Sequence, residues 1–153
     1  MNKNNYGNRN YNQNTFQQRR DFQESEVVVI SREIKNANFT LFKYLTKEDL
    51  YLPEGKAYKI ANGFKSTKSN QIRKIYSMVK EAEELTKTDG FEKGLEKMFM
   101  ILPLVAYAVG RELVEKDFFE LMKVCINNDK LKSDKDIYTF SKFFESIVAY
   151  LKK

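Results

Sequence analysis

Histidine is absent from the sequence and cysteine occurs once, and both shortages exclude kinds of chemistry. Without histidine there is no Ser-His-Asp or Cys-His activation of a nucleophile, no imidazole base and no histidine ligand for a metal. Because Cys125 is the sole cysteine, neither an intramolecular disulfide nor a cysteine-based zinc site can form. This usage is typical of a reducing compartment, so we expect a cytoplasmic protein.

Long apolar segments are also missing. The longest apolar run, Met98 to Gly110, has 13 residues and contains Pro103, whereas a membrane-spanning helix needs about 20. The N-terminus lacks the short basic stretch followed by an apolar stretch that marks a secretory signal. We therefore expect neither a membrane partner nor export.

Common catalytic motifs do not occur either: there is no Gly-x-x-x-x-Gly-Lys, no Gly-x-Gly-x-x-Gly and no Gly-x-Ser-x-Gly. Two carboxylates from the groups Glu81, Glu83 and Glu84, or Asp134 and Asp136, could hold Mg²⁺ for phosphodiester cleavage. We expect these side chains instead on exposed helix turns beside lysines, or at helix N-termini, where acids complement the dipole. The sequence therefore predicts no enzyme, no cofactor and no metal. A metal-dependent nuclease stays an alternative, with cleavage lost in Asp134→Ala combined with Asp136→Ala.

The length of 153 residues fits one domain, and the composition divides it into a tail and a body. Residues 1–25 hold seven Asn and four Gln, with aromatic residues at no helical or strand period. Such a segment buries too little apolar surface to offset its ordering entropy, so we expect a disordered tail. It is either a solvated leader or an arm whose arginines touch RNA. Residues 26–153 form the expected folded domain.

Apolar residues at helical spacing dominate this domain. The Val-Val-Val-Ile run from Val27 could be a strand, but no comparable second run follows and one strand cannot form a sheet. We interpret it as a packing segment before a short helix near Ser31 to Asn38. The spacing then predicts helices over residues 54–64, 91–109 and 113–127, and a last one after a Ser133-x-x-Asp136 cap. Between the first two, the hydroxyls of Ser66-Thr67-Lys68-Ser69 are expected to cap an amphipathic helix that runs to about Leu85. The expected fold class is all-α, a single helical bundle of about five helices with a disordered N-terminal tail.

Some positions in these helices have expected roles. The wide apolar stripe over residues 91–109 predicts a helix central to the core. Cys125 lies in the apolar stripe of the next helix and is expected to be a small core residue. In the last helix Phe144 lies on the apolar face, which leaves Phe143 and Tyr150 as candidates for contacts with neighbouring subunits.

Positive charge is concentrated in one window. The chain carries 27 Lys and Arg against 21 Asp and Glu, a net charge of +6. The 25 residues from Lys56 to Lys80 contain seven basic residues and no acidic one, so the window carries +7 and the rest of the chain sums to −1. Because like charges repel one another unless a partner relieves them, this excess indicates an anionic ligand.

The helix expected after Thr67 turns its apolar side inward and exposes Arg73, Lys74, Ser77 and Lys80. At its start, the hydroxyls of Thr67 and Ser69, free backbone N–H groups and the helix dipole predict a phosphate-binding geometry. RNA or DNA backbone fits better than a membrane, because no bulky apolar face is left free for insertion. We find no zinc-finger spacing, aromatic ribonucleoprotein motif or Gly-x-x-Gly clamp, so the expected contact is independent of nucleotide sequence.

Three segments then resemble a known family. They are Ser69-Asn70-Gln71-Ile72-Arg73-Lys74, Leu102-Pro103-Leu104-Val105-Ala106-Tyr107-Ala108-Val109-Gly110-Arg111 and Phe143-Phe144-Glu145-Ser146-Ile147-Val148-Ala149-Tyr150. In this order and spacing they are similar to the small subunit of the type III-A CRISPR effector, the Csm complex. The resemblance covers residues 64–153 and leaves the N-terminal quarter, with its Asn/Gln-rich tail, uncovered.

The resemblance implies an all-helical, non-catalytic protein in several copies that lines the inner side of a ribonucleoprotein filament in antiviral defence. Its implied partners are guide RNA and target RNA, held by their backbone, the large and backbone subunits of the complex, and copies of itself. The resemblance implies that Gln71, Arg73, Lys74 and Arg111, which match the family's basic motif residues, bind RNA. The local positive charge adds Lys65, Lys68 and Lys80 to the expected RNA-binding residues. Arg111 has an equal structural interpretation, capping carbonyls or pairing with Glu112 or Glu115. A free-standing helical nucleic-acid-binding protein, such as a dimeric regulator, is the alternative.

Overall fold

A computed structural model describes residues 24–65 and 67–151, and within these ranges all regular structure is helical. The prediction of an all-α fold is confirmed, whereas the expected disordered tail of residues 1–25 lies almost entirely outside the described residues. The described part contains nine helices rather than about five. They are α2 (Glu26–Asn36), α3 (Leu41–Tyr44), α4 (Lys47–Tyr51), α5 (Lys56–Gly63), α6 (Ser69–Asp89), α7 (Phe91–Phe99), α8 (Ile101–Gly110), α9 (Lys116–Cys125) and α10 (Asp134–Tyr150).

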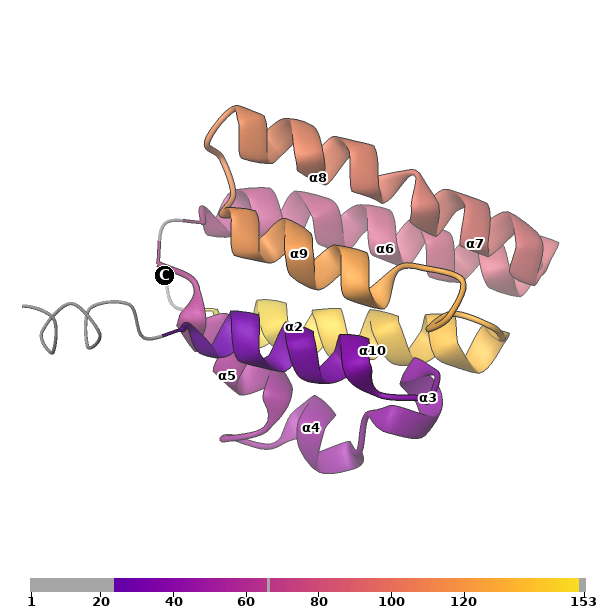
Figure 1. Ribbon diagram of the computed structural model, residues 1–153. Helices are drawn as coiled ribbons and strands as arrows, with labels where there is room; N and C mark the ends of the chain where they lie inside the picture. The colour runs from indigo at the N-terminus through magenta and orange to yellow at the C-terminus, as the bar shows by residue number, and fades with distance from the viewer. Residues whose placement is uncertain (1–23, 66, 152–153) are drawn as a thin grey trace, which may run out of the picture.

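Helix α10 is the centre of the bundle (Figure 1). It contacts α3, α4 and α5 on one side and α6 and α7 on another. Helices α6 and α7 form a hairpin, α2 packs on α9, and α8 lies at the upper edge of the view, where it contacts α6, α7 and α9. The 17-residue α10 accordingly buries residues on more than one face: Asp136, Ile137, Thr139, Phe140, Ser141, Phe143, Phe144 and Ile147.

The Val27 run is helical, which corrects our interpretation of it as a segment preceding a helix. Ser25 caps α2, because its hydroxyl accepts a hydrogen bond from the N–H of Val28 at 3.3 Å. Val27, Ile30 and Ile34 then follow at helical spacing and are buried. Burial of this stripe outweighs the weak helix propensity of β-branched residues, so α2 begins five residues earlier than predicted.

Residues 91–109 do not form one central helix, and that prediction is wrong. Helix α7 ends at Phe99 and α8 begins at Ile101, with Met100 between them in a turn. Pro103 has no N–H to donate to the Phe99 carbonyl four residues back, which explains the break. Helix α8 buries Ile101, Val105 and Ala108 on one side only, so it covers the edge of the core and is not its centre.

Phe143 and Tyr150 are the predicted candidates for contacts with neighbouring subunits, and the prediction is wrong for Phe143, whereas Tyr150 is half-buried. Phe143 is fully buried, because helices pack on more than one side of α10. Tyr150 packs edge-on against Tyr58, with ring centroids 5.1 Å apart, and its hydroxyl donates to the Tyr51 carbonyl at 2.8 Å. Cys125, in contrast, is buried as predicted, and burial raises the pKa of its thiol to about 12.

Candidate nucleic-acid interface

Helix α6 has the two faces that its sequence predicts. Ile72, Ile75 and Val79 are buried on the side toward α7, α8 and α10. Arg73 and Lys74 are exposed on the other side, together with Ser77. Because all three exposed positions lie on one regular helix, their spacing is rigid.

The phosphate-binding geometry predicted at the start of α6 is wrong at Thr67. The N–H groups of Lys65 and Thr67 both donate to one carboxylate oxygen of Glu115, at 3.1 Å for Thr67. The N–H of Glu115 in turn donates to the Thr67 hydroxyl at 2.8 Å. An internal anion therefore occupies the N–H groups of Lys65 and Thr67, which precede α6, and these two are not open to a phosphate. The N-cap residue is Lys68, without a side-chain cap bond, and Ser66, also expected to cap, lies outside the described residues.

The contact between Glu115 and Thr67 holds the turn after α8 against the loop before α6, and candidate binding residues lie in both places. The N–H of Lys68 donates to the Leu113 carbonyl at 3.4 Å, beside the contacts of Glu115. Glu112 has φ 59°, in the left-handed region, and turns the chain sharply after α8. Arg111 lies two residues before Leu113, a span of at most about 7 Å of chain. The structure thus brings Arg111 to the loop that carries the exposed Lys65 and Lys68.

Lys80 and Gln71 are less available than Arg73 and Lys74. The ammonium of Lys80 pairs with Glu83 at 3.0 Å and lies 5.7 Å from the centre of the Tyr76 ring. The hydrogen bond with Glu83 raises the pKa of Lys80, which keeps it charged. Gln71 is half-buried in the first turn of α6. Lys80 therefore contributes positive potential while its ammonium is held by α6 itself.

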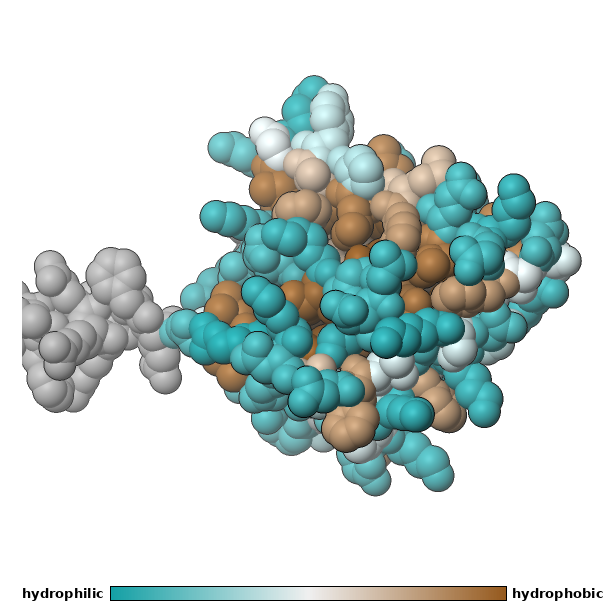
Figure 2. Space-filling model, turned by 45° about the vertical axis from the view of Figure 1, so that its right-hand side comes forward, coloured by the Kyte–Doolittle hydropathy of each residue, from teal (hydrophilic) through white to brown (hydrophobic). Residues whose placement is uncertain are grey.

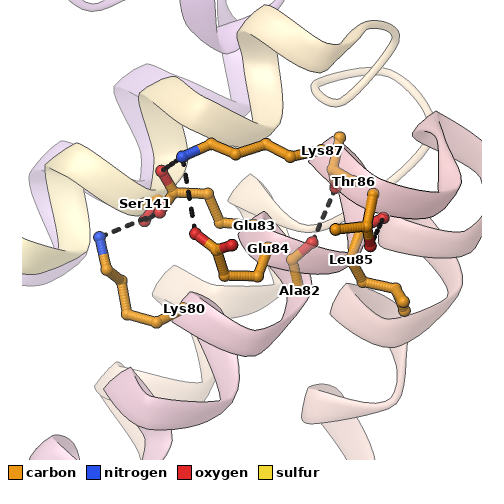
Figure 3. Close-up of polar contacts among 9 residues, drawn as sticks. Lys80, Ala82, Glu83, Glu84, Leu85, Thr86, Lys87 and Ser141 are labelled. Carbon is orange, nitrogen blue, oxygen red and sulfur yellow. Dashed lines mark hydrogen bonds and ion pairs between the residues drawn. The ribbon is translucent and has the colours of Figure 1, made fainter.

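Glu83 is not on an exposed turn as predicted; it is buried and connects α6 to α10 (Figure 3). Its carboxylate accepts a hydrogen bond from the Ser141 hydroxyl at 2.5 Å and pairs with Lys80 at 3.0 Å and Lys87 at 3.5 Å. Burial alone raises the pKa of Glu83, but the hydrogen bonds from Ser141 and Lys80 and the two ammonium charges outweigh burial and lower it. The carboxylate therefore stabilises the helix contact in its charged form.

This network predicts a pH-dependent stability. A carboxyl with a lowered pKa stabilises the fold above its unfolded pKa, near 4.3, and that stability is lost as the pH falls through its folded pKa. We expect Glu83→Gln to lower the free energy of unfolding at pH 7, and the gap to wild type to narrow as the pH falls below about 4. Urea unfolding at several pH values measures this. Glu84→Gln, at an exposed neighbouring carboxylate, is the control and should shift stability little at any pH. A gap independent of pH would contradict the assigned charge state.

The second acidic group also has a structural role. Asp136 is buried, and its carboxylate accepts from the N–H groups of Phe42 and Lys132, both at 2.9 Å, and of Ser133 at 3.1 Å. The predicted cap at Ser133 is thus present, and it also fixes the start of α3. Within the described ranges no group of three or more His, Cys, Asp or Glu side chains is arranged to hold a metal ion. Because Asp136 is buried and accepts three backbone hydrogen bonds, the double substitution of Asp134 and Asp136 would disrupt the fold. Asp134→Ala alone therefore tests the nuclease alternative.

Arg111 lies on the aromatic ring of Tyr107, one helical turn earlier. Its guanidinium is 5.8 Å from the ring centre and donates to the Tyr107 hydroxyl at 3.1 Å. Both side chains are exposed. Sequence reasoning named Arg111 but missed Tyr107, although the spacing of four residues is the signal that pairs them on a helix.

The fold and this surface define the class of the protein: it is a small all-α protein with a basic face exposed on one helix. None of the described helices is long and apolar enough to cross a membrane. The chain belongs to the Csm2 Type III-A family, whose model matches residues 47–153. It is therefore a small subunit of the type III-A CRISPR Csm complex, which confirms the resemblance.

A curated relative agrees with this family. The chain is 25% identical over 84 residues to the "CRISPR system Cms protein Csm2" of Streptococcus thermophilus. The alignment covers 55% of this chain and 69% of that protein. No solved structure matches the chain.

Proposed function

We propose that this chain is a non-catalytic scaffold subunit that binds the backbone of guide RNA and target RNA without reading their sequence. The binding residues form what we call the basic surface: Lys65, Lys68, Gln71, Arg73, Lys74, Lys80 and Arg111. The observation that carries this proposal is the local charge of +7 in a chain with a net charge of +6. Two of these charges, Arg73 and Lys74, are exposed side by side on α6.

Arg73 and Lys74 have no competing charge inside the described chain. The ion pairs found within residues 24–65 and 67–151 engage other cations, such as Lys56 with Glu33 and Lys97 with Glu81, and leave these two without a carboxylate. Cations held at fixed spacing and open to solvent can neutralise phosphates and release their condensed counterions. Such contacts position a nucleic acid but carry no sequence information, which suits a complex whose guide supplies the sequence.

Membership of the Csm complex places other Csm subunits around this chain. We propose that its neighbours are the large subunit, the backbone subunit and further copies of itself along the inner filament. We also propose that it works in the cytoplasm, where guide RNA and target RNA are present. Its role there is to hold the RNA, while cleavage belongs to other subunits.

Reversing both exposed charges should weaken RNA binding and leave the fold intact. We expect Arg73→Glu with Lys74→Glu to lower the affinity for RNA roughly tenfold at low salt, and to reduce the slope of log K against log salt by about one to two. Acidic residues in the first turns of α6 also suit the helix dipole, so thermal stability should not fall. Fluorescence anisotropy of labelled RNA at several salt concentrations measures both effects.

The matched control reverses two exposed lysines elsewhere. Lys43→Glu with Lys47→Glu, on α3 and α4, changes the net charge from +6 to +2, as the test variant does. It should keep the wild-type salt slope. The tagged variants purified from native cells give a second readout, since wild type should bring down a multi-subunit particle with short RNAs of discrete length. Equal RNA retention by both double variants would contradict the basic surface, and recovery of the protein alone or as a plain dimer would favour a free-standing protein.

A further inference from the structure

Helix α8 exposes a stripe of large apolar side chains. Met100, just before α8, and Leu104 and Tyr107 within it are 55%, 52% and 64% exposed, and they follow one another at helical spacing. The adjacent side of the helix is buried through Val105 and Ala108. Figure 2 shows apolar residues at the surface in the upper part of the molecule, at the height of α8 in Figure 1. The stripe is therefore a rigid surface and not part of the core.

Tyr107 is the most exposed of the large apolar residues in the described part of the chain, and its ring has a partner in Arg111. Arg111 holds it from the next turn through the ring contact of 5.8 Å and the hydrogen bond to the hydroxyl at 3.1 Å. The cation lies at the C-terminal end of α8, where the helix dipole favours positive charge. The pair is thus a pre-oriented aromatic ring with a guanidinium attached.

This pair adjoins the basic surface. The hydrogen bonds from Lys68 to Leu113 and between Glu115 and Thr67 fix the turn after α8 against the loop before α6. A strand whose phosphates lie on Lys68 then meets the turn that follows Arg111, and Tyr107 lies one helical turn before Arg111. Proteins that bind single strands combine a cationic track for the backbone with an aromatic side chain on which a base stacks.

We propose that Tyr107, backed by Arg111, stacks on an unpaired base of the RNA whose backbone lies on the basic surface. This inference rests on the proposed function and adds a base contact to it. Stacking is tolerant of base identity, because every base has a π-face, so it is compatible with binding that does not read sequence. A protein segment covering this pair would have to supply acceptors for the remaining N–H groups of Arg111, whereas the phosphates of an RNA strand on the adjoining basic surface supply them directly, which favours RNA as the occupant.

The test separates the ring from its neighbours. Tyr107→Ala removes the ring, Tyr107→Phe keeps it without the hydroxyl, and Leu104→Ala removes an exposed apolar side chain one turn earlier. The probes are a labelled single-stranded oligouridine and an RNA duplex of equal length, with anisotropy read at several salt concentrations. We expect Tyr107→Ala to weaken single-strand binding about tenfold without changing the salt slope, since one stacked base but no charge is lost.

The controls should behave differently. Tyr107→Phe and Leu104→Ala should bind the single strand within about twofold of wild type, and Tyr107→Ala should bind the duplex normally, because paired bases are not free to stack on a side chain. Normal single-strand binding by Tyr107→Ala, while the Arg73 and Lys74 reversal still weakens it, would overturn this inference alone. No RNA binding by wild type would overturn the proposed function as well. Loss of self-association or of complex assembly in both Tyr107→Ala and Leu104→Ala, with RNA binding unchanged, would assign the stripe to a protein partner and overturn the inference.

Discussion

Replacing Phe144 by alanine should lower the free energy of unfolding by about 3–5 kcal/mol. Phe144 is 1% exposed and lies at the centre of an aromatic cluster. Its ring centre is 6.1 Å from that of Tyr76, with the rings nearly parallel, and 6.0 Å from both Phe118 and Phe140. The cluster joins α6, α9 and α10, so a cavity there loses contacts with three helices at once.

Urea unfolding followed by circular dichroism measures the loss, and two controls define it. Phe144→Leu keeps most of the volume and should cost less than about 1.5 kcal/mol. Phe39→Ala removes an equal side chain from the surface, where Phe39 is exposed, and should change stability by less than about 0.5 kcal/mol. If Phe144→Ala resembled Phe39→Ala, the ring would not be at the centre of the core.

The faces of helices were predictable where one side meets solvent. The side chains of Ile72, Ile75 and Val79 recur at three and four residues, and burial follows that period in α6. Phe143 shows where this reasoning fails. It lies off the stripe of Phe144, yet it is buried, because helices pack on more than one side of α10. The exposed side of α10 is a narrow face through Lys142, Glu145 and Ala149, so the buried arc is wider than the one apolar stripe that periodicity identifies.

Boundaries failed for a different reason, since they depend on contacts that local sequence does not show. The Val27 run has strand propensity but becomes helix where α2 packs on α9 and α5. The short helices α3 and α4 were not predicted, although Thr46 supplies a capping box with Asp49. Helices of four and five residues are too short for a hydrophobic period to be visible.

The basic surface was predictable in composition but only partly in geometry. Counting charges along the chain identifies Arg73 and Lys74, because the charge of a side chain can be read from the sequence without knowing its neighbours in the fold. The hydrogen bonds from Lys65 and Thr67 to the Glu115 carboxylate were not predictable, because Glu115 lies about 50 positions away in the chain. This internal contact closes the N–H groups of Lys65 and Thr67 to a phosphate, and the hydrogen bond from Lys68 to Leu113 holds the turn after Arg111 against the same loop. The RNA contacts themselves stay a prediction.

The other large effect is expected at Gly94, where α7 packs against Thr86 of α6. A Cβ atom on Gly94 would lie 1.7 Å from the Thr86 hydroxyl oxygen and 3.0 Å from the Thr86 Cα. Thr86 is buried, and its hydroxyl is fixed by a hydrogen bond of 2.7 Å to the Ala82 carbonyl. The two helices are joined directly at Gly90, so α7 has little chain with which to move away. We therefore expect Gly94→Ala to destabilise the protein by about 1–3 kcal/mol.

Gly110→Ala is the matched control, because it is the same substitution in another helix. A Cβ atom there meets no atom within 4 Å, and Gly110 does not have a positive φ. Alanine should then stabilise the protein by up to about 0.5 kcal/mol, because Gly110 is the last residue of α8, where helix propensity counts for less than in the interior. Denaturant midpoints of the two variants should therefore move in opposite directions. A double-mutant cycle with Thr86→Ala adds a check on the contact, since removing the hydroxyl should make the Gly94 substitution less costly. Equal effects of Gly94→Ala with and without Thr86 would mean that the helices do not touch at this point.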